Sequence, residues 1–275
     1  MSLQLDQRQR AMLKEMGVQV WQPALPTGRK DAASHDRSQR EDAALAAPGA
    51  SVAGSTPSAV ASAVVSPVAP RALPGEVASL DWESLRAAVV GCQACSLCQS
   101  RANTVFGVGD KQARWLVVGE APGEQEDQQG EPFVGQAGQL LDNMLRAIGL
   151  NRQATNGPGV YIANVLKCRP PANRNPSAQE VAQCEPFLRR QVELLKPSII
   201  LAMGRFAAQS LLSDSVPDVA SIALGKLRGQ VHHYQQVPVV VTYHPAYLLR
   251  SPQDKAKAWV DLCLAKAVIQ GQRTA

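Results

Sequence analysis

The chain of 275 residues is 45% hydrophobic, which is enough to bury the core of one α/β domain with an extension or of two small domains. Its formal net charge of +5 is compatible with a polyanionic partner, but so modest an excess does not by itself indicate nucleic-acid binding. Six cysteines in a chain of this length suggest a metal or cluster site and argue against a disulfide framework.

The first 22 residues have the pattern of an amphipathic peptide. In "QLDQRQRAMLKEMGVQVWQP" the leucines, methionines, valines and tryptophan give a roughly helical apolar face before a proline. A short helix cannot bury such a face alone, so we expect it to dock on a partner or on the main domain. The peptide resembles the amino-terminal peptide of the psi subunit of the bacterial clamp loader, which implies a replication-machinery partner for residues 5–22. No secretory leader pattern is present, so we expect a cytoplasmic protein.

Residues 23–75 are rich in Ala, Pro and Ser and are predicted to be a disordered linker. The stretch "SAVASAVVSPVAP" is apolar, but it is too short and too interrupted by proline to span a bilayer. We therefore expect no membrane segment. The apolar residues crowd into the rest of the chain, which favours a single domain at residues 76–275.

From residue 76 onward, short apolar runs alternate with helix-like segments. The runs are rich in β-branched residues and lie at Trp115–Glu120, Val160–Lys167, Ser198–Gly204 and Val237–His244. The helix-like segments are 135–150, 177–196, 205–212 and 252–270. This alternation predicts an α/β fold of three layers, α/β/α, with a central, mainly parallel four-stranded sheet. In such a sheet a ligand site lies beyond the carboxyl ends of the strands.

The first apolar run leads into a glycine-rich loop, "GEAPGEQEDQQGEPFVGQAGQLL". A glycine-rich turn between a strand and a helix is typical of phosphate binding. Here, however, the loop carries five carboxylates that would repel a phosphate: Glu120, Glu124, Glu126, Asp127 and Glu131. Its glycines also lack the G-x-G-x-x-G spacing, so a dinucleotide-dependent oxidoreductase is not favoured.

Four cysteines have a spacing suited to a metal centre. Cys92-x-x-Cys95, followed by Cys168 and Cys184, offers four thiolates to a [4Fe–4S] cluster or a tetrahedral zinc ion, although buried free thiols would fit the spacing as well. Cys98 continues the spacing of the first pair and is a further candidate ligand. Cys263 lies in an apolar helical segment, and we expect it to be a buried free thiol.

Three other side chains, two near predicted strand ends and one in the glycine-rich loop, have two interpretations each. Asn164 is either a structural hydrogen-bonding group or a reader of a donor and acceptor pair on a nucleobase edge. His244 is either a helix-entry or core histidine or a donor to an anion that develops on a substrate. Phe133 is either a core residue or a face on which a base stacks.

Taken together, these motifs resemble a family 4 uracil-DNA glycosylase, the iron–sulfur branch of bacteria and archaea. The glycine-rich loop, "NVLKCRPPANRNP", the four cysteines and "HPAYLLR" occur in the order of that family, between about Leu80 and Ile269. The resemblance implies an α/β/α fold, a [4Fe–4S] cluster and hydrolysis of the N-glycosidic bond of deoxyuridine in DNA, a step of base excision repair. It also implies DNA containing uracil as the partner, and we expect a monomer.

The resemblance assigns roles residue by residue. It implies Glu120 and His244 as catalytic residues. The uracil-binding residues that it implies are Ala121, Phe133, Asn164 and His244. The cluster ligands that it implies are Cys92, Cys95, Cys168 and Cys184, which leaves Cys98 as an extra thiol.

Excision leaves positive charge on the sugar and negative charge on the departing base. We expect Glu120 to orient the attacking water and stabilise the sugar cation, while His244 and the loop amides stabilise the uracil anion. Either Leu248 or Leu249 is predicted to wedge into the vacated base stack and Arg250 to hold a backbone phosphate, unless both leucines are core residues at the start of a helix. The alternative function is a non-catalytic iron–sulfur DNA-binding protein, which would not need the acid, amide and histidine together.

Overall fold

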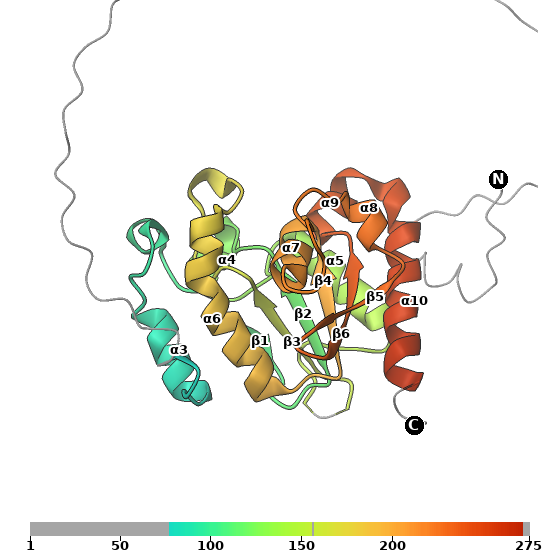
Figure 1. Cartoon of the computed structure of the whole chain (residues 1–275), viewed down its shortest axis with the longest axis horizontal. Coiled ribbons are helices and arrows are strands. Elements are labelled where there is room, and N and C mark those ends of the chain that lie inside the picture. Colours follow the sequence, from blue (N-terminus) through green and yellow to red (C-terminus); the bar gives the residue numbers. More distant parts are fainter. Residues whose placement is uncertain (1–76, 156, 272–275) are drawn as a thin grey trace, which may run out of the picture. The chain divides into compact units, whose positions relative to one another are not determined.

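The computed structural model describes residues 77–155 and 157–271 (Figure 1). The amphipathic peptide predicted for residues 1–22 and the linker predicted for residues 23–75 lie outside these ranges, so both stay predictions. None of the described helices combines the length and the apolar character needed to cross a membrane.

The described chain forms one six-stranded sheet in the order β1-β3-β2-β4-β6-β5. The strands are β1 (Val108–Gly109), β2 (Trp115–Gly119), β3 (Val160–Asn164), β4 (Ile199–Met203), β5 (Val231–Tyr234) and β6 (Val237–Thr242). The four central strands, β3, β2, β4 and β6, are parallel to one another, and they are the four strands predicted from the sequence. The predicted α/β class is confirmed. The sheet has two strands more than predicted, because β1 and β5 pair antiparallel at its edges.

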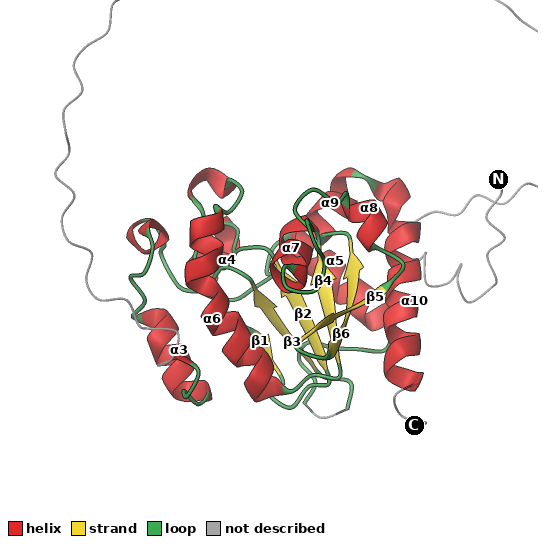
Figure 2. Ribbon diagram, viewed as in Figure 1, coloured by secondary structure: helices red, strands yellow, loops and turns green. Residues whose placement is uncertain are grey.

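Helices cover both faces of this sheet (Figure 2). Within the described ranges the α-helices are α3 (Trp82–Val90), α4 (Glu124–Gln129), α5 (Gln136–Ala147), α6 (Ala178–Leu195), α7 (Arg205–Leu212), α8 (Leu224–Leu227), α9 (Pro245–Arg250) and α10 (Lys255–Gly271). The same ranges contain the short 3-10 helices η1 (Ser96–Gln99), η2 (Pro171–Asn173) and η3 (Pro252–Asp254).

Every residue of β2, β3 and β4 is buried, as expected of parallel strands covered on both faces. Alternate side chains enter two separate cores. Val117 packs on one face in a core that contains Leu141 of α5 and Leu262 of α10. Val118 packs on the other face in a core that contains Leu188 of α6 and Leu211 of α7. These are the three layers that the sequence pattern predicts.

One prediction about the helices is wrong. Cys263 was expected to be buried, but it is exposed on α10, where Val260 is exposed as well. In the sequence of α10 the apolar residues are spread over all sides of the helix. The pattern alone therefore does not reveal which side faces the sheet.

The parallel register brings the carboxyl ends of the central strands to one edge of the sheet. Gly119, the last residue of β2, lies opposite Asn164, the last residue of β3. Met203 at the end of β4 lies opposite Thr242 at the end of β6. Asn164 ends β3, and the loops after β2 and β6 carry Glu120 and His244, so the fold gathers these residues at this edge.

Candidate active site

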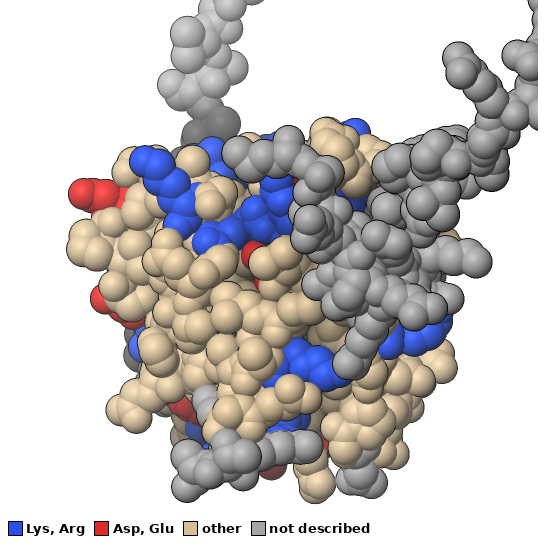
Figure 3. Space-filling model, turned by 90° about the vertical axis from the view of Figure 1, so that its right-hand side faces the viewer, with Lys and Arg blue, Asp and Glu red and all other residues tan. Residues whose placement is uncertain are grey.

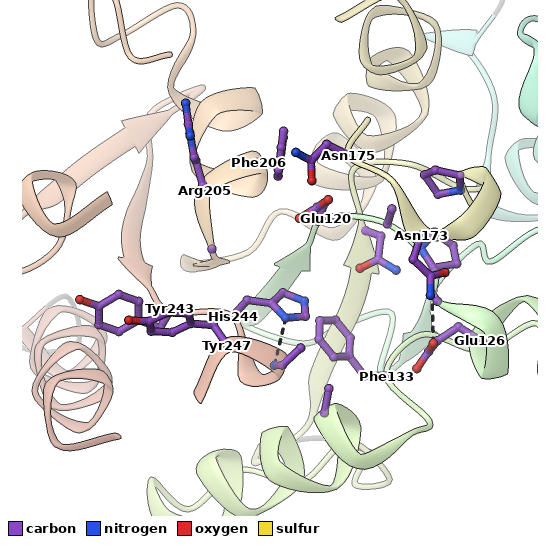
Figure 4. A pocket seen from close by; sticks show the side chains of 18 of the residues that line it. Glu120, Glu126, Phe133, Asn173, Asn175, Arg205, Phe206, Tyr243, His244 and Tyr247 are labelled. Carbon is purple, nitrogen blue, oxygen red and sulfur yellow. Dashed lines mark hydrogen bonds between the residues drawn. The ribbon is translucent and has the colours of Figure 1, made fainter. Parts of the chain in front are cut away.

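A pocket of about 680 Å³ opens at the carboxyl edge of the sheet (Figure 4). A volume of this order is typical of a site for a small organic ligand. The predicted site residues that line it are Glu120, Ala121, Phe133, Asn164, His244 and Arg250. The fold thus brings together side chains that are separated by more than a hundred residues in the sequence.

Asn164 lines this pocket and is buried, with 2% of its surface exposed. Its side-chain oxygen, Oδ1, is buried and has no hydrogen-bond partner within the described structure. An unpaired buried acceptor is costly, of the order of 1–3 kcal/mol, and such atoms mark places where a missing partner belongs. A ligand with an N–H group in the pocket would supply that partner.

Gly119 lets two side chains approach the end of β2. A Cβ atom added at this residue would lie 2.6 Å from Cζ of Phe133 and closer still to Oδ1 of Asn164. Contacts this short are not tolerated, so only glycine leaves both side chains where they are. The glycine in the loop thus makes room for the amide and the aromatic ring.

Phe133 is held in an unusual backbone conformation beside the pocket. Its φ angle is 57°, in the left-handed region that non-glycine residues seldom adopt. The carbonyl group of Phe133 lies against Gly138 of α5, where a side chain would collide with it. The ring stacks on the His244 ring, with centroids 5.4 Å apart and an angle of 27° between the planes.

His244 is the N-cap residue of α9, and this role determines which ring nitrogen carries the proton. Nδ1 accepts a hydrogen bond from the backbone amide of Ala246 at 3.2 Å. Burial, with the charge of Arg250 adding to it, lowers the pKa of His244 to about 4, against a smaller opposing effect of Glu126. The neutral ring therefore carries its proton on Nε2, which is the atom free to donate to a ligand.

Glu120 follows β2 directly and is half-buried in the pocket wall. Its backbone carbonyl accepts a hydrogen bond from the amide of Leu166 at 3.0 Å, which continues the pairing with the chain after β3. Burial raises the pKa of the Glu120 carboxyl to about 7. A carboxyl group with such a pKa exchanges protons near neutral pH, as a general base requires.

The two leucines of α9 have different environments. Leu248 is fully buried in the core that contains α5, so it is not a wedge and this part of the prediction is corrected. Leu249 is 40% exposed, and the adjacent Arg250 is exposed at the pocket. Consecutive helical residues point about 100° apart, which explains why only one of the two leucines faces solvent.

Sequence reasoning missed several residues of the pocket. One of them is Glu126, whose carboxylate accepts hydrogen bonds from the backbone amides of Gly123, Val134 and Gly135. It thereby ties the loop after β2 to the loop that carries Phe133. The other residues that line the pocket and were not predicted include Asn173, Arg174, Asn175, Arg205, Phe206, Tyr243 and Tyr247.

Five cysteines surround a second, small cavity, on the side of the sheet that carries α6. They are Cys92, Cys95, Cys98, Cys168 and Cys184. Burial raises the pKa of the Cys184 thiol to about 12 and also raises the pKa values of Cys95 and Cys168. Thiolates at such positions need compensating positive charge, which a bound metal centre supplies. Arg101 donates to Cys168 Sγ at 3.1 Å, and the donor set fits a metal–thiolate group.

Comparisons with known proteins agree with this geometry. Residues 106–267 match the profile of the uracil DNA glycosylase superfamily. A type-4 uracil-DNA glycosylase of Archaeoglobus fulgidus is 44% identical over 169 residues, which cover 60% of this chain and 81% of that protein. A type-4 uracil-DNA glycosylase of Sulfurisphaera tokodaii is 41% identical over 62% of this chain and 76% of its own. A type-5 uracil-DNA glycosylase of Pyrobaculum aerophilum is 33% identical over 51% of this chain and 64% of its own. The chain belongs to the uracil DNA glycosylase superfamily.

Proposed function

We propose that the protein is a DNA-repair glycosylase that hydrolyses the N-glycosidic bond of deoxyuridine in DNA, releasing uracil and leaving an abasic site. The observation that carries the proposal is the unpaired, buried Oδ1 of Asn164 in a pocket that also contains Glu120 and His244. Membership of the uracil DNA glycosylase superfamily supports the same activity.

Base recognition rests on Asn164 and Phe133. A carboxamide offers one acceptor and two donors, so Asn164 Oδ1 accepts from N3–H of uracil while its Nδ2 donates to O4. Cytosine presents an acceptor and a donor at these two positions, in the opposite order, and is disfavoured. Phe133 provides the aromatic face for the flipped base. Ala121 forms part of the same wall of the pocket, where its backbone approaches the base.

Catalysis separates two charges at the bond that breaks. The bond between C1′ and N1 breaks with its electron pair going to the uracil ring, and the oxygen of a water molecule bonds to C1′. Glu120 orients this water, accepts its proton and stabilises the sugar cation, while Nε2–H of His244 donates to the developing negative charge on uracil O2. The neutral state of His244 at physiological pH suits a hydrogen-bond donor to that anion.

Uracil must leave the base stack before it reaches this pocket, at a cost of about a few kcal/mol in a duplex. We assign Leu249, the exposed leucine of α9, to fill the vacated space. Arg250 contacts a backbone phosphate, and Arg174 and Arg205 line the same pocket. Figure 3 shows Lys and Arg side chains gathered on the upper part of one face of the molecule, at the end toward which the central strands point.

Cys92, Cys95, Cys168 and Cys184 would hold a [4Fe–4S] cluster. The choice of a cluster over zinc rests on the resemblance to the family 4 glycosylases, because four thiolates suit either group. Hydrolysis moves no electrons between substrate and protein, so a cluster would supply a structural crosslink for the segment from Cys168 to Cys184.

The test is cleavage of a labelled oligonucleotide that holds one uracil, placed opposite guanine, opposite adenine or unpaired, with alkali to reveal abasic sites. We expect cleavage with uracil, none with thymine, and a loss of roughly 10²- to 10³-fold in the Glu120→Ala variant. If protein with a full complement of iron leaves every uracil substrate intact, the alternative of a non-catalytic iron–sulfur DNA-binding protein is the better account.

Residues 76–275 are proposed as the catalytic domain, and residues 5–22 as a tether to the replication machinery through the linker at 23–75. The tether predicts that deletion of residues 1–22 leaves excision of uracil from oligonucleotides unchanged but removes partner proteins from affinity purifications. Identical partners with and without these residues would contradict it.

A further inference from the structure

Lys167 carries a buried amino group directly behind the residue that reads the base. Its side chain is 1% exposed and is among the largest fully buried side chains of the described chain. Nζ donates to the backbone carbonyl oxygen of Asn164 at 2.8 Å and to Oε1 of Gln191 at 2.7 Å. A buried lysine is costly unless its donors are satisfied, so its presence here calls for a physical explanation.

Gln191 extends this network from α6 to the edge of the sheet. It is fully buried, and its Nε2 donates to the backbone carbonyl oxygen of Phe106 at 2.9 Å. The same nitrogen lies 3.4 Å from the hydroxyl group of Tyr161 in β3. Within this group of side chains, the only buried polar atom without a partner is Oδ1 of Asn164.

The hydrogen-bond network of Lys167 and Gln191 lies at the point where backbone pairing between β1 and β3 ends. The antiparallel register pairs Val108 with Ile162 and Gly109 with Tyr161. Continued by two residues, this register would place Phe106 opposite Asn164. Instead of a direct backbone contact, the side chains of Lys167 and Gln191 join the carbonyl groups of these two residues.

We propose that Lys167 is a positioning residue for base recognition: it fixes the backbone of Asn164 so that the side-chain amide points into the pocket. The inference rests on the proposed function, in which Asn164 reads uracil. On the β2 side, Asn164 lies opposite Gly119. On the β1 side, where Asn164 has no backbone partner, the Lys167 contact holds this end of β3. Displacement of a substrate-contacting group by about 1 Å costs roughly 10²-fold in rate.

The experiment is a double-mutant cycle between Lys167→Met and Asn164→Ala, measured as single-turnover excision of uracil. Methionine keeps the length and apolar character of the side chain but removes its donors. We expect Lys167→Met to slow excision by roughly 10²-fold when Asn164 is present, and by less than about 2-fold in the Asn164→Ala background. The affinity for free uracil, measured by calorimetry, should follow the same pattern.

Lys266→Met is the matched control. Lys266 also donates to a backbone carbonyl oxygen, that of Ile148 at 3.2 Å, but it lines a cavity that contains none of the pocket residues. This variant should excise uracil within about 2-fold of the wild-type rate. Gln191→Leu removes the other partner of the Lys167 ammonium group, and it should show the same dependence on Asn164 with a smaller effect.

The iron content of each variant separates positioning from a general loss of structure. Equal slowing by Lys167→Met in both backgrounds would overturn the inference, and loss of iron in the same variant would assign the residue to the cysteine segment. Excision by Lys167→Met at the wild-type rate would overturn the inference as well. Failure of the wild-type protein to excise uracil would instead refute the proposed function, so the two failures are distinguishable.

Discussion

Lowering the pH from 8 to 6 should slow uracil excision about tenfold through the protonation of one carboxyl group. Burial raises the pKa of Glu120 to about 7, so roughly nine-tenths of the carboxyl groups are ionised at pH 8 and roughly one-tenth at pH 6. In the proposed mechanism only the ionised form orients and deprotonates water. His244, with a pKa lowered to about 4, stays neutral over this range, so its ionisation adds no second slope to the pH–rate profile. The rate should therefore rise with pH and level off above about 7.

The assay is single-turnover excision from a single-stranded oligonucleotide, which removes base pairing from the pH dependence. Glu120→Gln is the control, because it should lose roughly 10²- to 10³-fold at pH 8 and show a flat profile. A wild-type rate that is constant between pH 5 and 8 would refute the assignment of Glu120 as the base. A rate that is highest below pH 6 would refute the neutral donor role of His244.

Four further predictions concern activity and stability. Leu249→Ala should slow excision from duplex DNA but not from single strands, whereas Leu248→Ala should lower the free energy of unfolding by about 2–5 kcal/mol in denaturant titrations. Gly119→Ala should keep the fold, as judged by circular dichroism, but lose roughly 10²-fold in excision because the added Cβ displaces Asn164. Because its pKa is raised on folding, Glu120 contributes stability that is present below pH 4.5 and lost as the pH rises through 7. Glu120→Gln should therefore raise the melting temperature at pH 8 but not at pH 4.

The central sheet could be predicted because its strands are buried on both faces. A strand such as β4, with the sequence IILAM, is apolar throughout, and the same is true of most of β2. The edge strands carry no such signal. β1 has two residues, one of them glycine, and β5 has the sequence VHHY with mostly exposed or half-buried residues. Their pairing depends on tertiary neighbours, which a local pattern does not reveal.

The site could be predicted in part because parallel strands end at one edge. Asn164 and Glu120 stand at strand ends, so their meeting follows from the topology alone. Glu126 could not be recognised in the same way, because the two loops that it joins through backbone amides come together only in the folded chain. The choice between Leu248 and Leu249 depends on the rotation of α9 about its axis, which the sequence "PAYLLR" leaves open.

Burial in the pocket has the same effect on Glu120 and on His244, and the proposed catalysis depends on this shared effect. Burial disfavours the charged form of each group, which raises the pKa of Glu120 and lowers that of His244. The ionised carboxylate is therefore poorly stabilised in the resting pocket, and in the proposed mechanism it gains most when a positive charge develops on the sugar. A neutral histidine likewise gains most when its N–H group faces an anion. Interactions that strengthen as charge separates lower the barrier, whereas a solvated acid and a charged histidine would bind ground and transition states more equally.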